Sequence, residues 1–219
     1  RIDLVKSYPA KIAQDLLSGQ IDIGLVPVAI IPQLTHPHII SNYVIGTNGA
    51  VASVALFSEV PLEQIKTVYL DYQSRTSVQL LKILLAEYWK VEVNFSTASE
   101  GYIDQISGTT AGLIIGDRAL DNLSKFPYVY DLGLAWKQHT GLPFVFAAWV
   151  ANQPIPSEFM AAFDAANGYG LAHLDEVIAL IPAQEQVYDL HKYYTENISY
   201  VYDEEKKLGL NAFLNLIKS

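Results

Sequence analysis

Cysteine is absent from this 219-residue chain, and arginine occurs only three times, at positions 1, 75 and 118. The lack of cysteine excludes disulfides, thiolate metal sites and a cysteine nucleophile, and it leaves the redox compartment open. The few arginines accompany a net charge of −9 and an isoelectric point of about 4.9. Because phosphate-rich polymers are bound by clustered Lys and Arg, nucleic acids and anionic membrane surfaces are disfavoured as partners.

Long hydrophobic runs are also missing, although 51% of the residues are apolar and the mean hydropathy is +0.19. No run approaches the roughly 20 apolar residues that span a bilayer, so the apolar content indicates buried strands and helix faces. The length suits one large or two small domains. The chain begins at Arg1 rather than Met, and we expect that it is N-terminally shortened.

The first 28 residues alternate between extended and helical patterns. Residues 1–6 predict a strand, Ser7 and Pro9 open a helix that ends at Gly19, and residues 21–28 predict a buried strand. A strand–helix–strand order implies a parallel pair with a right-handed crossover.

The rest of the chain continues in two blocks. Up to residue 124, apolar strands alternate with short helices, and after residue 149 the pattern is almost entirely helical. We expect strands over 38–45, 50–57, 67–70, 91–95, 111–115 and 144–150, and helices over 61–65, 76–89, 100–106, 117–124, 156–167, 172–181, 183–196 and 203–217.

This order of elements favours an α/β protein with two lobes. The first lobe takes residues 1–57 and 143–219, and residues 67–142 form a second lobe inserted into it. Two chain crossings between α/β lobes are the layout of type II periplasmic-binding-protein folds, which hold a small ligand in the interlobe cleft.

Three turns predict ligand contacts. Ser74-Arg-Thr-Ser77 follows a predicted strand and opens a predicted helix. Backbone N–H groups and hydroxyls at such a helix start suit an anion. Alternatively, Ser74 or Thr76 acts only as a helix cap. Asn48-Gly49 is either a β-turn or a cleft contact. Gly116-Asp117 is typical of a capped helix start, from which Asp117 can orient a ligand hydroxyl.

Basic and metal-binding side chains give weaker signals. Arg75 and Arg118 adjoin these strand-to-helix turns, and each suits either a carboxylate ligand or a surface ion pair. His36 and His38 have metal-ligand spacing on a Pro-containing loop, but no carboxylates lie nearby in the sequence, so we predict no metal site. No Ser-His-Asp set and no Gly-rich phosphate loop is present.

The run from Tyr130 to Trp149 carries the strongest signal, because the turn Thr140-Gly-Leu-Pro143 separates a helical patch around Trp136 from a buried strand. We expect the backbone to approach another group closely at this turn. This run and four others resemble the chorismate dehydratase family of the futalosine route to menaquinone, in family order: Asp22–Val28, Ser53–Ser58, Ser74–Val78 with Leu80–Lys82, and Gly116-Asp117 with Ala119-Leu120.

The resemblance implies a periplasmic-binding-protein-like fold without a transport function, located in the cytoplasm. It implies removal of water from chorismate to give 3-[(1-carboxyvinyl)oxy]benzoate, without a cofactor. Candidate substrate contacts are Ser74, Thr76 and Ser77 for a carboxylate, with Asn48, Gly49, Gly116, Asp117, Thr140 and Gly141 as further candidates.

The resemblance also has gaps. No His or Glu of this chain stands in a cleft motif as the base, so we hypothesise that the substrate's enolpyruvyl carboxylate removes the proton. The family's opening strand, with a cleft-lining Ser-Tyr-Leu-Asn-like segment, is not present in the sequence. Two alternatives stay open: a solute-binding protein for a small carboxylate, and the naphthoate-forming enzyme of the same pathway. The absence of a His near Gly116 argues against the second.

Overall fold

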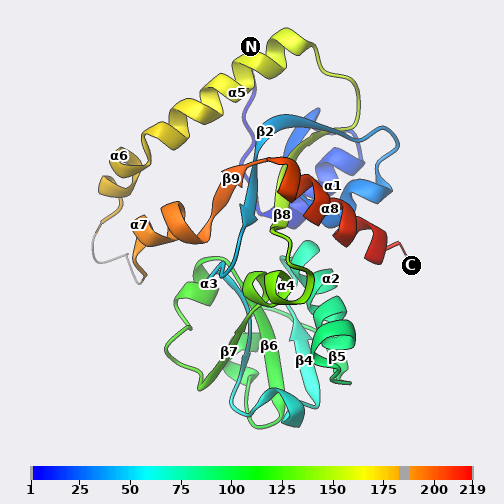
Figure 1. The fold of residues 1–219 in the computed structure, drawn as a ribbon, viewed down its shortest axis with the longest axis vertical. Helices are drawn as coiled ribbons and strands as arrows, with labels where there is room; N and C mark the ends of the chain where they lie inside the picture. The colour runs from blue at the N-terminus through cyan, green and yellow to red at the C-terminus, as the bar shows by residue number, and fades with distance from the viewer. Residues whose placement is uncertain (1, 183–187, 219) are drawn as a thin grey trace.

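The computed structural model describes residues 2–182 and 188–218, and it has two β-sheets that define two lobes (Figure 1). The four-stranded lobe contains the sheet of order β1-β8-β2-β9, and the five-stranded lobe contains the sheet of order β5-β4-β6-β3-β7. The predicted two-lobed α/β architecture is therefore confirmed.

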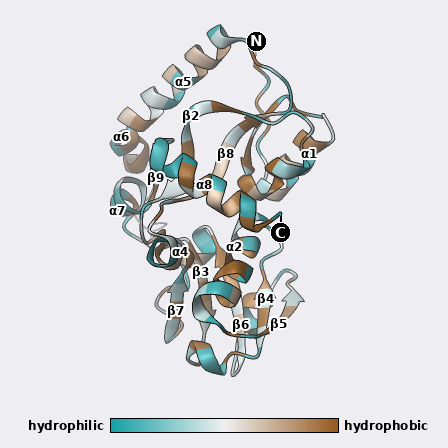
Figure 2. Cartoon of the chain, turned by 45° about the vertical axis from the view of Figure 1, so that its right-hand side comes forward, coloured by the Kyte–Doolittle hydropathy of each residue, from teal (hydrophilic) through white to brown (hydrophobic). Residues whose placement is uncertain are grey.

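The four-stranded sheet is antiparallel throughout. Its central strands β8 (Phe144–Ala151) and β2 (His38–Thr47) pair with each other, and β1 (Ile23–Pro27) and β9 (Ser199–Val201) form its edges. Outside this sheet α5 (Ser157–Ala172) and α6 (Leu174–Ala179) run along one side of the molecule, and α5 carries a mixture of hydrophobic and hydrophilic residues (Figures 1 and 2).

The five-stranded sheet is mixed. Strand β4 (Thr67–Leu70) pairs in parallel with β5 (Asn94–Thr97) and β6 (Thr110–Ile115), while β3 (Val54–Ser58) pairs antiparallel with β6 and with β7 (Tyr128–Asp131). All five residues of β3 are buried, as expected for a strand covered on both faces.

Two expectations about the first residues are wrong. Residues 2–7 form neither a helix nor a strand, so no parallel pair forms, and β1 pairs antiparallel with β8 instead. Helix α1 (Pro9–Leu17) begins after Tyr8, and no side chain caps it. An alternating pattern specifies a strand only when a partner strand supplies hydrogen bonds, and among the described residues none pairs with residues 2–7.

The crossing between the lobes differs from the expectation as well. Strand β3 belongs to the five-stranded sheet, so the chain leaves the four-stranded lobe at the end of β2 and not near Phe57. The link at residues 48–53 is held by Asp131, whose carboxylate accepts hydrogen bonds from the N–H groups of Val51 and Ala52 at 3.2 and 2.7 Å.

The predicted helix over 76–89 is confirmed as α2 (Thr76–Ile83), which continues as a π-helical segment, η3 (Leu84–Trp89). Residues 183–187 of the helix expected over 183–196 lie outside the described residues. The remaining helical elements are η1 (Val28–Gln33), η2 (Leu62–Gln64), η4 (Tyr102–Gln105), α3 (Asp117–Leu120), α4 (Leu132–Thr140), α7 (Leu190–Lys192), η6 (Tyr193–Asn197) and α8 (Glu204–Leu216).

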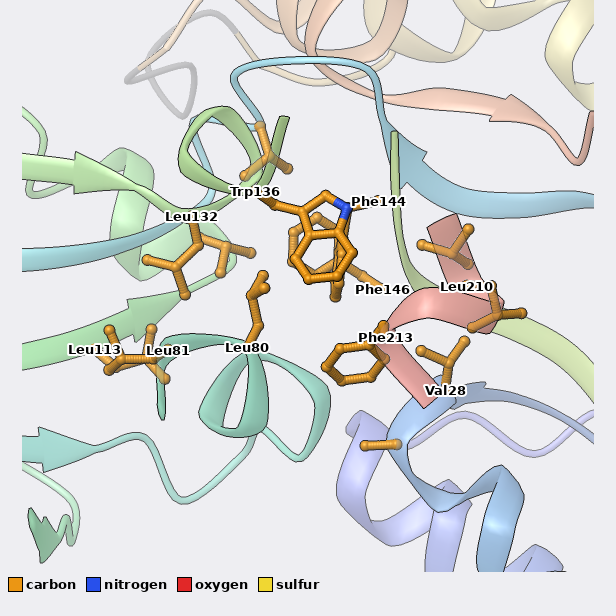
Figure 3. Packing of buried hydrophobic residues seen from close by; sticks show 14 of the residues in the cluster. Val28, Leu80, Leu81, Leu113, Leu132, Trp136, Phe144, Phe146, Leu210 and Phe213 are labelled. Atoms are coloured by element: carbon orange, nitrogen blue, oxygen red, sulfur yellow. The ribbon is translucent and has the colours of Figure 1, made fainter. Parts of the chain in front are cut away.

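The lobes meet at an aromatic cluster that we call the joint, made by Trp136 of α4, Phe144 and Phe146 of β8, and Phe213 of α8 (Figure 3). The rings are 4.7 to 6.3 Å apart and pack edge to face, an arrangement that adds to the gain from burial. Leu80 of α2 points toward this cluster, so the joint touches both lobes.

No helix among the described residues is long and apolar enough to cross a membrane.

Candidate functional site

A cavity with a volume of about 1030 Å³ is lined by residues of both lobes. The five-stranded lobe contributes the start of α2 and the end of β6, and the four-stranded lobe contributes β1, part of β8 and the chain on either side of α1. This size matches the upper range of small-molecule sites, which favour clefts between domains.

The start of α2 places three hydroxyl groups on the cavity, those of Ser74, Thr76 and Ser77. Ser74 Oγ accepts a hydrogen bond from the Ser77 N–H at 3.1 Å, so Ser74 caps the helix as well as lining the cavity. Thr76 Oγ1 accepts a hydrogen bond from the N–H of Ala29 in the other lobe at 3.2 Å. The turn therefore combines a helix N-terminus, hydroxyl donors and a fixed position between the lobes, which suits an anionic group.

Gly116 continues this wall at the end of β6. Its φ is +66°, a conformation that side chains rarely adopt, and its N–H donates to the carbonyl oxygen of Ser53 at 2.8 Å. Asp117 begins α3 next to it, is exposed and does not line the cavity. The predicted role of Asp117 as a substrate contact therefore gains no support from its position.

The opposite wall is mostly apolar and belongs to the four-stranded lobe. Trp149 and Phe146 of β8 lie beside Leu25 of β1, and Asp22 accepts a hydrogen bond from Gln153 Nε2 at 3.2 Å. Aromatic and aliphatic walls with a few polar groups are typical of sites that hold and orient small organic ligands.

Residues 2–7 form a third wall of the cavity. Ile2 and Leu4 of this segment are 69% and 74% exposed. Strand β1, which also lines the cavity, is an edge strand of the four-stranded sheet.

Besides Asp117, four further residues predicted as substrate contacts do not line the cavity. Thr140 Oγ1 accepts from the N–H of Leu142 and donates to the carbonyl of Trp136, and Gly141 ends α4 with φ +74°. Asn48 is exposed, and Gly49 sits in the turn on which α4 packs. Their substrate-binding role stays a prediction without support from their placement.

The close approach expected at the 140–143 turn occurs, but not at its glycine. A Cβ on Gly141 would meet nothing within 4 Å, whereas one on Gly209 of α8 would clash with the carbonyl oxygen of Pro143. The turn is therefore pressed against α8, and the glycine that permits the contact is in the helix.

The two arginines have different surroundings, and neither lines the cavity. Arg75 is exposed, and its guanidinium makes no hydrogen bond or ion pair with another described residue. Arg118 pairs with Asp71, a buried carboxylate at the end of β4, at 2.8 Å. The surface ion pair expected for Arg118 is therefore a pair with a buried partner.

Sequence reasoning missed several cavity residues, namely Gln20, Asp22, Gln73, Trp149 and Gln153. Gln73 precedes the predicted Ser74 turn, and Trp149 lies in the signature run, so both stood next to a recognised signal. Asp22 and Gln153 meet only through the β1–β8 pairing, which sequence spacing does not reveal.

Two acidic groups of the five-stranded lobe have raised pKa values. Burial and the neighbouring Asp71 carboxylate raise the pKa of Tyr102, so its hydroxyl stays protonated and acts as a donor. Burial raises the pKa of Asp131 at the lobe crossing, against the lowering effect of the N–H groups it accepts from. The described residues contain no group of three or more His, Asp or Glu placed to hold a metal ion.

Comparisons with known proteins agree with the resemblance. A family described as "Menaquinone biosynthesis" matches residues 1–219. The chain is 31% identical over 236 residues to chorismate dehydratase of Thermus thermophilus, with 96% of this chain and 84% of that protein covered.

Two solved structures share the fold. Protein AF1704 of Archaeoglobus fulgidus matches with a TM-score of 0.64 and 12% identity, covering 98% of this chain and 84% of that one. An ABC transporter protein of Parabacteroides distasonis matches with a TM-score of 0.62 and 19% identity, covering 100% and 81%. At these identities the likeness concerns the fold alone, and it confirms the periplasmic-binding-protein-like architecture.

Proposed function

This chain belongs to the menaquinone biosynthesis family, and we propose that it is a cytoplasmic lyase that removes water from chorismate to give 3-[(1-carboxyvinyl)oxy]benzoate. The observation that carries the proposal is the cavity between the lobes, with the hydroxyls of Ser74, Thr76 and Ser77 at the start of α2. A family in menaquinone biosynthesis acts on small molecules, and a cavity of this volume accommodates one.

Chorismate carries two carboxylates, and the protein has a net charge of −9, so local donors must hold the ligand against the overall field. We place one carboxylate at the start of α2, where the helix dipole and the hydroxyls of Thr76 and Ser77 offer hydrogen bonds. The ring then faces the apolar wall of Trp149 and Phe146.

The reaction breaks the C3–H bond and the C4–O bond. The C3 electron pair forms the new ring double bond, hydroxide leaves from C4, and the proton and hydroxide together make the released water. Charge that develops on the ring carboxylate during proton removal is stabilised by the donors at the start of α2, because preorganised donors act most strongly on developing charge. Aromatisation supplies the driving force.

The base is proposed to be the enolpyruvyl carboxylate of chorismate itself. Among the described residues that line the cavity there is no histidine, and Asp3 and Asp22 are the two that carry carboxylates. We would replace each with asparagine and measure turnover and binding separately. If Asp22→Asn or Asp3→Asn abolishes turnover and leaves chorismate binding intact, that carboxylate is the base and substrate assistance is wrong.

The proposal is tested by incubating the chain with chorismate and following the mass and ultraviolet spectrum of the products. We expect loss of one water with the appearance of an aromatic benzoate. Binding is read separately from tryptophan fluorescence, since Trp149 lines the cavity. A Ser77→Ala variant should weaken binding and turnover, whereas Thr140→Val, away from the cavity, should leave both near the parent values.

Saturable binding of chorismate without any dehydration would contradict the lyase and favour a binding protein for small carboxylates. Absence of both binding and turnover in the folded protein would contradict chorismate as the ligand.

A further inference from the structure

A buried polar network lies directly behind the cavity wall, centred on Asp71. Asp71 follows the last residue of β4 and is 2% exposed. Its carboxylate accepts hydrogen bonds from the Tyr102 hydroxyl at 2.9 Å, from the N–H of Gln73 at 2.8 Å and from Arg118 Nη2 at 2.8 and 3.1 Å. A buried carboxylate with this many donors has one fixed orientation.

Arg118 contacts three consecutive residues of the turn that leads into α2. Besides Asp71, its Nη2 donates to Gln73 Oε1 at 3.1 Å, and its guanidinium lies 5.5 Å from the centre of the Tyr72 ring. Gln73 lines the cavity, and Ser74 follows it. The guanidinium therefore holds the backbone and one side chain of the turn that ends in the cavity hydroxyls.

Arg118 also belongs to the second cavity-lining turn. It is the second residue of α3, two positions after Gly116. The Arg118–Asp71 pair thus joins the turn after β4 to the turn after β6. These parallel strands are neighbours in the sheet, and this side-chain pair, together with the Arg118–Gln73 hydrogen bond and the strand hydrogen bonds, links their ends.

We propose that Arg118 and Asp71 are positioning residues for the anion site, which hold the Ser74–Ser77 turn and Gly116 at the separation that a ligand carboxylate requires. This inference rests on the proposed function, because the ligand used to test it is chorismate. Arg118 acts through Asp71 and Gln73 and does not touch the ligand, since it does not line the cavity.

The first test is Arg118→Met, which keeps the aliphatic stem and removes the donors. We expect KM and the fluorescence-derived Kd for chorismate to rise about tenfold or more, because a displaced site loses binding even when its own groups are intact. The kcat should fall less than KM rises, because the ligand is held both before and during the reaction. Arg118→Lys should recover part of the lost affinity. A lysine ammonium can reach one acceptor, but it cannot bond both Asp71 oxygens and Gln73 Oε1 as the planar guanidinium does.

The matched control is Arg75→Met. Arg75 carries the same charge and precedes α2, whereas Arg118 lies in α3, and the Arg75 guanidinium has no ion pair with another described residue. We expect less than a twofold change in Kd. Equal losses in Arg75→Met and Arg118→Met would assign the effect to long-range charge and overturn the positioning role.

A double variant separates positioning from simple loss of stability. Arg118→Met leaves a buried carboxylate without its cation, which destabilises the fold, whereas Arg118→Met with Asp71→Asn removes both charges. The double variant should match Arg118→Met in Kd, since both residues act through one contact. Independent losses that multiply would overturn the inference. Tyr102→Phe removes one donor to Asp71 and should raise Kd by a smaller factor, provided that circular dichroism shows an intact fold.

Failures of the two proposals are distinguishable. A parent protein that neither binds nor dehydrates chorismate contradicts the proposed function together with this inference. A parent protein that does both, with an Arg118→Met variant of unchanged Kd and KM, contradicts the inference alone.

Discussion

The two lobes differ in how completely they bury their apolar residues. In the five-stranded lobe, all of β3 is buried and α2 with η3 covers the sheet through Leu80, Leu81, Leu84 and Leu85. In the four-stranded lobe, α5 has no buried residue along its sixteen positions, and the β1 edge is unpaired. The wall with the Ser74, Thr76 and Ser77 hydroxyls belongs to the five-stranded lobe, in which β3 is fully buried, and the apolar wall belongs to the four-stranded lobe, in which α5 stays partly exposed.

The joint connects these two environments. Trp136, Phe144 and Phe213 come from three elements and are all at most 1% exposed. Because they touch each other across the lobe boundary (Figure 3), the relative position of the lobes depends on them more than on any contact of α5.

The largest effect is expected from breaking the joint with Phe213→Ala. Removing a fully buried ring leaves a cavity, and the free energy of unfolding should fall by about 3–5 kcal/mol. Urea unfolding measures this loss, with Leu208→Ala on the same helix as the control. Leu208 is 58% exposed, so its truncation should change stability by less than about 0.5 kcal/mol. Similar losses in both variants would show that the joint does not hold the lobes.

A smaller effect on stability is expected when alanine replaces either of two glycines in α8 and α5, and its sign should differ between the two positions. Gly209→Ala places a methyl group against the Pro143 carbonyl oxygen and should lower the free energy of unfolding by about 1–3 kcal/mol. Gly170→Ala in α5 meets nothing within 4 Å and should raise it by about 0.5–1 kcal/mol, because alanine favours the helix. Thermal unfolding of both variants tests the difference in sign. Stabilisation by both would mean that α8 does not press on the turn.

The smallest effect concerns pH and the start of α8. Burial raises the pKa of Asp203, but hydrogen bonds from the N–H and the ammonium group of Lys206 outweigh it, so the pKa lies below its ordinary value. A lowered carboxyl pKa stabilises the fold above the unfolded pKa of about 3.9, and this contribution is lost as the pH falls through the folded pKa.

Asp203→Ala should therefore cost about 1 kcal/mol near neutral pH, and the difference from the parent should narrow below about pH 4. Asp203→Asn keeps the capping oxygen without the charge, so its advantage over Asp203→Ala should not change with pH. Melting temperatures from pH 3 to 7 measure both differences. A difference from the parent that stays constant over this range would contradict the role of the carboxylate charge.

The sequence predicted the five-stranded lobe better than the four-stranded one, for physical reasons. Strand 67–70 and helix 76–89 have strong local patterns, and both are confirmed. Strands β7 and β9, one in each lobe, were missed because they are defined by their pairing with β3 and β2 and not by a local pattern. The strand expected over residues 1–6 failed because pairing, not propensity, decides whether an extended segment joins a sheet.

For the candidate site, too, the residues that lie in a local sequence pattern were predicted and the others were not. Ser74, Thr76, Ser77 and Gly116 were recognised because a strand-to-helix turn is visible in the sequence, and all four line the cavity. Thr140 and Asn48 were chosen by their place in conspicuous motifs, but the fold uses those motifs to join the lobes. The Asp71–Arg118 pair links residues 47 positions apart and has no local signal.

The most direct measurement is a crystal structure of the protein with bound 3-[(1-carboxyvinyl)oxy]benzoate. Our account predicts a carboxylate of this product within hydrogen-bonding distance of Ser77 or Thr76, with its ring against Trp149 and with the Arg118–Asp71 pair intact behind the turn. A product carboxylate held instead at Thr140–Gly141 or at Asn48, with the α2 turn empty, would contradict it.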